Sequence, residues 1–378
     1  MTKKFWKFVT EDGRSPSARN GIKYIPGETV EVKDADPDKT IQCSSGIHCL
    51  DFSDEQYDTS NIVFGPKVAI LEVDEKDIIY YEKRGKCRVK KAKVLEVKEP
   101  ELWMRTGNGS VCWSFRCAYH CGHHPDVMQL IIDGGSSHYA SCYAQDILQE
   151  HDERLMQVII DGKCVAGIYS YASDILKGHD ERLMQAIIDS ESHGDAYRYA
   201  RNVLKGHDER LMQIIIDAQD VYHAYYYAKN VLKGHDGRLM EVIIDKKDAK
   251  YALFYARGVL KGHDERLMQI IIDSEDIRYA YYYAKDVLKG HDERLMQVII
   301  DSGDGHYAYY YAAFILKKHE AKLMQVVIDM KNSECAYNYA RYVLKGHDEK
   351  LMEIADNDPY YKKLYEKYVM CYKEQNND

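Results

Sequence analysis

Proline is nearly absent from the larger part of this sequence. The chain of 378 residues contains 7 prolines, and after residue 100 only Pro125 and Pro359 remain. Because proline interrupts helices, nothing between these two positions opposes a continuous helical array. Phenylalanine and tryptophan are also scarce, with 7 and 3 copies, whereas tyrosine has 33. Tyrosine is therefore the main aromatic residue from which a core can be built.

Long apolar runs are missing as well. No stretch approaches the roughly 18 apolar residues that a membrane-crossing helix needs. The N-terminal MTKKFWKFVTEDG lacks the apolar segment of a secretory signal. We therefore expect a cytoplasmic protein without membrane contact. The 10 cysteines are irregularly spaced, which is typical of reduced thiols in that compartment and not of a disulfide framework.

Basic residues are fewer than acidic ones, with 52 Lys and Arg against 61 Asp and Glu. The formal net charge is -9 at pH 7, and the acidic excess lies entirely in residues 101–378. An acidic array is a poor general binder of nucleic acid, because the phosphate backbone is itself negative. The length allows two or three domains, each with its own core. These features favour a folded soluble protein whose partner is not nucleic acid.

A period of 28 residues runs through most of the chain. Nine histidines follow one another at this spacing without insertion or deletion: His123, His151, His179, His207, His235, His263, His291, His319 and His347. Nine equal active sites are implausible, so we interpret the repeated His-Asp-Glu-Arg motif as architecture. We predict an all-α solenoid of about nine helix-turn-helix repeats over 106–357, followed by a capping helix and tail in 358–378.

Each repeat is predicted to contain two short helices. Tyr283 is expected in the core. Gly290 is expected to be the left-handed residue that ends the first helix, and Asp292 the N-cap of the second. Helices this short are marginal alone, so the repeats must stack. The histidine ring is predicted to bridge a helix end to the next repeat; metal binding and pH sensing are the alternatives. The predicted apolar positions are Ala280, Tyr283, Ala284, Val287 and Leu288, then Leu295, Met296, Ile299 and Ile300.

Function is expected where the repeats differ from one another, because the shared positions are needed for stacking. On a helical wheel, two variable columns point away from the core and carry large aromatic residues in the C-terminal repeats. They form a candidate partner-binding strip, or else they cover the loop of the next repeat. Its members are Tyr226, Phe254, Tyr282, Tyr310, Phe314 and Tyr342.

The first repeat contains a run of cysteines and histidines, CWSFRCAYHCGHH, between Cys112 and His124. Cys117, Cys121 and His124 share one face of a helix, and zinc accepts such ligands. The spacing matches no standard zinc finger, and both cysteines replace surface residues of the other repeats. We expect no metal here and no cofactor in the protein.

Residues 1–105 do not share the period and are predicted to form a small β-rich α+β domain. Alternating stretches at KFWKFV, ETVEV, VAILEV and CRVKKAKVLEV suggest strands, and Pro26 with Gly27 a turn. The last stretch carries a basic patch that either docks an acidic partner or is a solvated strand face. It comprises Lys83, Arg84, Lys86, Arg88, Lys90, Lys91 and Lys93.

The runs KFVTEDGRSPSARNGIKYIPGETVEV and IQCSSGIHCL resemble an uncharacterised small domain at the front of many phage and prophage proteins. Cys43, Gly46, His48 and Cys49 match the Cys, Gly-aliphatic-His, Cys pattern of that domain. The Tyr-Ala and VLKG signature is similar to helical repeats from the same class of genomes. Those repeats often have an Arg-Trp-Pro-Glu-like stretch after the glycine, where this chain has His-Asp-Glu-Arg. The resemblance implies origin and architecture, and it carries no established activity.

The layout of GIHCLDFSDEQY followed by VAILEVDE is also similar to ADP-ribosyltransferase-like folds. That resemblance implies a nicotinamide-type pocket lined by His48, Ser53 and Tyr57, with Glu72 as an acid. Our main hypothesis is instead a non-enzymatic, protein-binding solenoid of phage or mobile-element origin that inhibits or regulates a host protein. The alternative is an NAD-dependent transferase whose solenoid selects the target.

Removal of one whole period tests the repeat interpretation. Deletion of residues 263–290 should leave a shorter chain that still unfolds cooperatively, because each repeat depends only on its neighbours. Thermal unfolding followed by circular dichroism measures this. A deletion of 14 residues, about half a period, is the matched control and should abolish the transition; loss of cooperativity in the whole-period deletion would contradict the interpretation.

Overall fold

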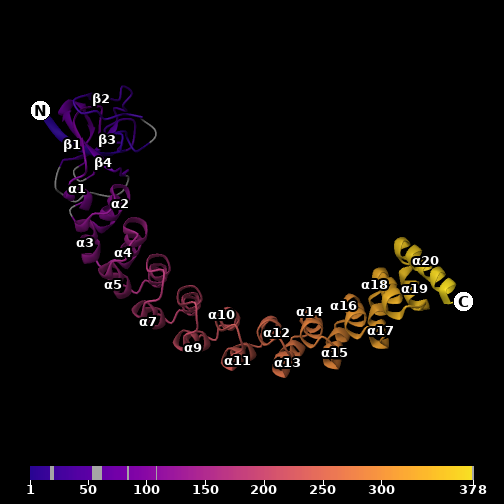
Figure 1. The fold of residues 1–378 in the computed structure, drawn as a ribbon. Coiled ribbons are helices and arrows are strands. Elements are labelled where there is room, and N and C mark those ends of the chain that lie inside the picture. Colours follow the sequence, from indigo (N-terminus) through magenta and orange to yellow (C-terminus); the bar gives the residue numbers. More distant parts are fainter. Residues whose placement is uncertain (18–20, 53–61, 83–84, 108, 377–378) are drawn as a thin grey trace. The chain divides into compact units, whose positions relative to one another are not determined.

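The computed structural model describes residues 1–17, 21–52, 62–82, 85–107 and 109–376, with side chains up to residue 372. The described chain forms two compact units, Met1–Glu191 and Ser192–Asp378. The first unit contains a β-sheet and the first helical pairs, and the second contains the remaining pairs (Figure 1). The predicted combination of an α+β region and a helical-repeat solenoid is confirmed.

The sheet is antiparallel and has seven strands in the order β2-β7-β4-β1-β3-β6-β5. The four predicted strand regions are present, and sequence reasoning missed β3 and β5. The bounds of the strands are β1 (Thr2–Val9), β2 (Thr29–Glu31), β3 (Ile47–Asp51), β4 (Lys67–Asp74), β5 (Ile78–Tyr80), β6 (Lys86–Val89) and β7 (Lys91–Lys98). The label η marks a short 3-10 helix at η1 (Glu75–Asp77) and π-helical segments from η2 onward.

Both faces of the sheet are covered. Phe5, Val9 and Leu71 belong to one buried cluster, which the loops around β2 help to close. Trp6 and Phe8 alternate with these residues along β1 and belong to the opposite cluster. That second cluster also contains Met104 of α1 and Trp113 of α2, so the predicted boundary at residue 105 falls inside α1 and the first helices share a core with the sheet.

The helices of the first unit follow the sheet directly and then pair at the predicted period. Their bounds are α1 (Leu102–Thr106), α2 (Val111–Cys121), α3 (Pro125–Asp133), α4 (Ser137–Tyr143), η2 (Ala144–Leu148), α5 (Glu153–Asp161), α6 (Val165–Ser170), η3 (Tyr171–Ile175) and α7 (Glu181–Asp189).

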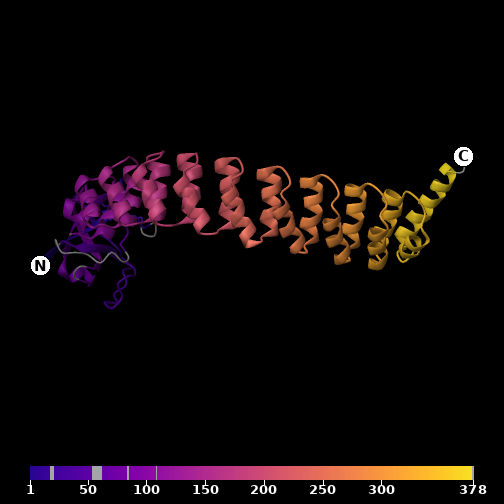
Figure 2. The same cartoon turned by 90° about the horizontal axis from the view of Figure 1, so that it is seen from below.

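Within the second unit the helical pairs stack in two layers. The first helices of successive pairs contact one another, as do the second helices, and Figures 1 and 2 show the two rows. The bounds are α8 (His193–Arg198), η4 (Tyr199–Leu204), α9 (Glu209–Asp217), α10 (Val221–Tyr227), η5 (Ala228–Leu232), α11 (Gly237–Lys246), α12 (Ala249–Tyr255), η6 (Ala256–Leu260), α13 (Glu265–Asp273), α14 (Ile277–Tyr282), η7 (Tyr283–Leu288), α15 (Glu293–Ser302), α16 (Gly305–Tyr310), η8 (Tyr311–Leu316), α17 (Ala321–Met330), α18 (Ser333–Asn338), η9 (Tyr339–Leu344), α19 (Glu349–Ala355) and α20 (Pro359–Asn376).

The predicted start of the second helix is confirmed. The carboxylate of Asp292 accepts hydrogen bonds from the backbone N–H groups of Arg294 and Leu295 and so caps α15. Leu295, Met296 and Ile299 are buried behind this cap. On the first helix, Tyr283 and its neighbouring alanines are fully buried, as the apolar stripe predicts.

The predicted end of the first helix is wrong by one residue. Lys289 adopts the left-handed conformation, with φ 54°, and Gly290 does not. The reason is that the helix widens to π-type over η7, and the carbonyl of Ala284 accepts the N–H groups of both Lys289 and Gly290. Two other repeats carry Glu150 and Lys318 where this one has Gly290, so glycine is not required at that position.

Lys289→Gly should therefore stabilise the protein by about 1 kcal/mol, because glycine adopts a positive φ without the steric penalty of a Cβ. Gly290→Ala should be neutral or slightly stabilising, since a Cβ there would meet only the Leu288 carbonyl oxygen at 3.8 Å. Urea unfolding of the two variants measures both effects. If Gly290→Ala destabilised the protein and Lys289→Gly did not stabilise it, Gly290 and not Lys289 would be the left-handed residue.

Candidate functional site

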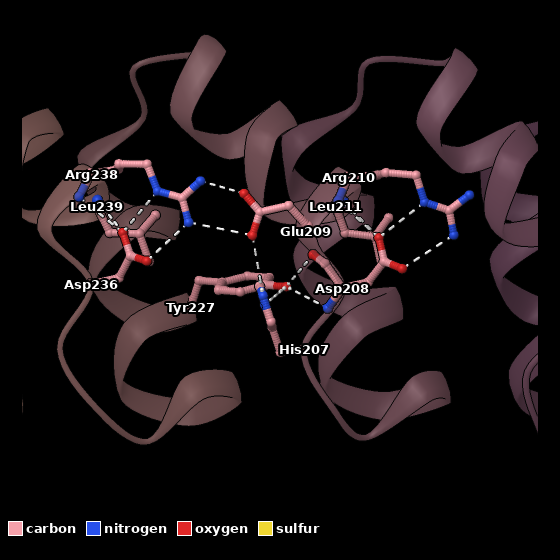
Figure 3. A network of polar contacts seen from close by, with 9 residues as sticks. All are labelled: His207, Asp208, Glu209, Arg210, Leu211, Tyr227, Asp236, Arg238 and Leu239. Carbon is pink, nitrogen blue, oxygen red and sulfur yellow. Dashed lines mark hydrogen bonds and ion pairs between the residues drawn. The ribbon is translucent and has the colours of Figure 1, made fainter.

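The repeated histidine lies beside a buried tyrosine hydroxyl of the following repeat. Nδ1 of His207 lies 3.2 Å from the hydroxyl oxygen of Tyr227, as Figure 3 shows. The same hydroxyl donates to the carbonyl of Asp208 at 3.0 Å and accepts the N–H of Asp208 at 3.3 Å. The same His–Tyr contact, at 2.9 to 3.3 Å, joins 123 to 143, 151 to 171, 235 to 255, 263 to 283, 291 to 311 and 319 to 339. The predicted bridge to the next repeat is confirmed.

These bonds use all the hydrogen-bonding capacity of the tyrosine. A hydroxyl has one proton and two lone pairs, so the donation to Asp208 leaves two acceptor positions, for the Asp208 N–H and for an Nδ1–H of His207. Burial, with a smaller contribution from the Asp208 charge, raises the pKa of Tyr227 to about 12. A neutral, fully bonded hydroxyl has no free nucleophile or proton to offer. The repeated motif therefore joins neighbouring repeats.

A second set of contacts crosses from repeat to repeat at the surface. The guanidinium of Arg238 pairs with the carboxylate of Glu209 in the preceding repeat and with Asp236 in its own (Figure 3). Arg294 makes the corresponding pairs with Glu265 and Asp292. The arginine and glutamate side chains are about half exposed, so each pair between repeats adds little to stability.

The predicted partner-binding residues all lie on the first helices of the second unit or in the π-type segments that end them. Tyr282, Tyr310, Phe314 and Tyr342 are exposed, to between 38% and 53%. Tyr226 and Phe254 are half-buried because their rings pack against other aromatic rings. Helical periodicity thus identified exposed rings in four of six positions.

Ring contacts gather five of these six residues into two clusters; the two clusters and Tyr342 together are called the aromatic surface. In the first cluster Tyr226 and Phe254 both contact Tyr225, with ring centroids 4.9 and 5.9 Å apart. In the second, Tyr310 contacts Phe314 at 6.1 Å and Tyr281 at 6.2 Å. Sequence reasoning missed several members, although all of them except Tyr222 belong to columns that are also rich in tyrosine: Tyr222, Tyr225, Tyr251, Tyr281, Tyr307 and Tyr309.

Cations lie over four aromatic rings of this region, of which Tyr225 and Tyr281 are buried, Phe254 is half-buried and Tyr342 is exposed. The Nζ atoms of Lys229 and Lys285 lie 5.3 and 5.4 Å from the ring centroids of Tyr225 and Tyr281. Corresponding positions of other repeats place Arg257 over Phe254, at 5.9 Å, and Arg341 over Tyr342, at 5.1 Å. The surface therefore combines apolar ring area with positive charge, although the protein as a whole is acidic.

A small cavity lies beside β1 and β3, with both polar and apolar side chains in its lining. The two strands are paired at Phe5 and Trp6, and the cavity lies beyond that point, where Lys7 approaches His48 and Cys49. Burial lowers the pKa of Lys7 to about 8, and Nζ is held by Ser15 and Tyr24 at 3.2 and 3.1 Å.

His48 lines the same cavity. Burial, assisted by nearby positive charge, lowers the pKa of its imidazole to about 4, and Nε2 is buried without a hydrogen-bond partner among the described residues. The cavity measures about 90 Å³, well below the roughly 300 to 1,000 Å³ of typical small-molecule sites. As the described residues form it, this cavity is therefore smaller than a nicotinamide-type pocket.

Of the other residues predicted for this catalytic pocket, Glu72 does not join His48 there. Glu72 lies on β4 opposite Lys4 and Lys93, and it does not line the cavity. Ser53 and Tyr57 lie outside the described residues. In the described part of the domain, the predicted histidine and acid are not brought together.

The predicted basic patch needs a correction. Arg88 is fully buried and bonds the carbonyl oxygens of Ser45 and Asp38, with the carboxylate of Asp36 3.7 Å away. It therefore fixes a loop and adds nothing to a positive surface. Lys83 and Arg84 lie outside the described residues.

The cysteine–histidine run also differs from its prediction. Cys117 is buried against the sheet, because the first repeat packs on strands where later repeats pack on another helix pair. Its sulfur lies 3.4 Å from that of Cys121, whereas Nδ1 of His124 caps α3. The described residues bring no three ligands of this run together. The ten cysteines are free thiols, as expected.

No family model matches the chain, and no curated protein or solved structure shows significant similarity to it. Among the described residues, no helix combines the length and the apolar character needed to span a membrane. The functional interpretation therefore depends on the geometry of the chain itself.

Tyr283→Phe should destabilise the protein by about 1 to 3 kcal/mol, because the N–H and carbonyl of Asp264 lose a buried partner. Tyr282→Phe is the matched control, since this hydroxyl is at an exposed position, and its effect should stay within about 0.5 kcal/mol. Urea unfolding of both variants measures the difference. Equal free energies of unfolding for the two variants would show that the hydrogen bonds of the buried Tyr283 hydroxyl do not stabilise the protein.

Proposed function

We propose that this protein is a binding module without enzymatic activity, and that its aromatic surface holds an acidic polypeptide segment with apolar anchor residues. Exposed tyrosines suit this role because they offer large contact areas and lose little conformational entropy on binding. The observation that carries the proposal is the exposure of Tyr282, Tyr310, Phe314 and Tyr342 beside cations, with Arg341 directly over the exposed ring of Tyr342.

Charge supports a polypeptide as the partner. Basic residues between aromatic rings also occur in proteins that bind single-stranded nucleic acid, but a net charge of -9 opposes a long polyphosphate chain. A short acidic segment needs only a local positive surface. Arg257 is already paired with Asp286 at 3.0 Å, so Lys229, Lys285 and Arg341 are the cations expected to meet such a partner.

Variation between repeats also supports this location. The buried column is Phe115 in the first repeat and tyrosine in every later one, whereas the column that contains Tyr282 and Tyr310 has Cys142, Ser170 and Arg198 in earlier copies. Positions free of stacking constraints are those that can specialise for one partner. The resemblance to phage and prophage proteins favours a host or viral protein in this role, and inhibition or regulation as the outcome of binding.

The test is affinity capture from the producing cell with the full chain and with a Tyr282→Ser/Tyr310→Ser double variant. The variant should lose the captured protein, with an affinity at least about thirtyfold lower, because buried aromatic anchors typically contribute 2 kcal/mol or more each. Nuclease treatment of the lysate should leave capture unchanged, and raised salt should weaken it.

Tyr119→Ser/Tyr360→Ser is the matched control. Both tyrosines are more than 60% exposed and lie outside the aromatic surface, so the control should bind as the unchanged chain does. Circular dichroism must give the same helicity for all variants. Retention of the partner by the first double variant, or its loss after nuclease treatment, would refute the proposal.

A further inference from the structure

Three side chains with metal-binding atoms converge between α8 and α10 in the second unit. His193 is the first residue of α8, Asp220 is the N-cap of α10, and His223 is the third residue of α10. One ligand atom from each lies within 4.8 Å of the other two. In the part of the chain that the structure describes, this is the one group of three that could hold a metal ion.

The contacts already organise the three ligands. Oδ1 of Asp220 accepts the backbone N–H of His223 at 2.7 Å and lies 2.9 Å from Nδ1 of that ring. Oδ2 lies 3.7 Å from Nε2 of His193. The helix cap thus fixes the carboxylate through one oxygen and directs the other oxygen to the preceding repeat.

The site is sheltered and still open to an ion. The side chains of His193, Asp220 and His223 are 41%, 31% and 19% exposed. An aspartate carboxylate is ordinarily ionised near neutral pH, which a metal ligand must be.

Stacking of the repeats does not explain the two histidines. An N-cap aspartate recurs without them at Asp248, Asp276 and Asp304, so the capping role accounts for Asp220 alone. The equivalents of His193 are Ser137, Val165, Val221, Ala249, Ile277, Gly305 and Ser333. The equivalents of His223 are Tyr139, Gly167, Asp195, Tyr251, Tyr279, Tyr307 and Cys335.

We propose that His193, Asp220 and His223 bind a zinc ion that clasps two successive repeats, with its fourth position open to water or to a donor atom of a partner. Two imidazoles and one carboxylate suit zinc, whereas calcium and magnesium prefer oxygen ligands. Zinc bonds of about 2.0 to 2.2 Å in a tetrahedron place ligand atoms about 3.4 Å apart. Nδ1 of His223 lies 2.9 Å from Oδ1 and Nε2 of His193 lies 3.7 Å from Oδ2, so each imidazole is near this separation from one oxygen of the carboxylate.

The full chain, freed of metal and kept reduced, should be titrated with Co²⁺ and then with Zn²⁺. We expect one equivalent of Co²⁺ with the visible absorption of tetrahedral nitrogen and oxygen coordination, and its displacement by Zn²⁺. Because 10 cysteines are present, the diagnostic feature is that this equivalent shows no thiolate-to-cobalt charge-transfer band. Zn²⁺ should also raise the melting temperature.

Asp220→Asn is the informative variant and Asp248→Asn its matched control, because asparagine caps a helix as well as aspartate does. Asp220→Asn should weaken Co²⁺ binding at least about tenfold and abolish the thermal shift, whereas Asp248→Asn should change neither. A His193→Gln/His223→Gln variant should lose the equivalent altogether. Equal binding by the two asparagine variants, charge-transfer absorption only, or no bound Co²⁺ would overturn the proposal.

Discussion

The bond on which the repeats depend is made by a hydroxyl at the end of a buried ring. Tyr227 fills the space between two helix pairs as a phenylalanine would, and its oxygen also satisfies the N–H and the carbonyl of Asp208 at the start of the preceding second helix. Helix starts leave backbone groups without partners. Each interface therefore combines apolar burial with a directional bond, and a shift of one residue would leave polar groups buried and unbonded.

Periodicity predicted most of this arrangement. Asp292 precedes an apolar stripe and is followed by helix-forming residues, which is enough to locate an N-cap. Tyr283 recurs beside small alanines, which is enough to locate the core. The end of the first helix could not be predicted this way, because a helical wheel assumes 3.6 residues per turn and the widened segment over η7 departs from it.

The candidate site was only partly predictable. Wheel positions identified Tyr310 and Phe314 as exposed, but not the contact of Tyr310 with Tyr281, which is buried and supports it from beneath. In the sheet, Ile47–Asp51 was interpreted as a motif and not as a strand, so its register opposite Lys86–Val89 was missed. The grouping of His193 with Asp220 was also missed, since it joins residues from neighbouring repeats.

The two ends of the helical series are closed by different means. Trp113 and Cys117 of α2 pack on the sheet, and at the other end Tyr365 of α20 donates to the carbonyl of Asp348 at 3.1 Å and accepts its N–H at 3.2 Å. Tyr365 thus takes the place that a further repeat would fill, although it reaches Asp348 from a helix of another length and sequence. Nearly identical interfaces could otherwise recruit a second chain and extend into a filament; a helix that occupies the last one limits such head-to-tail growth.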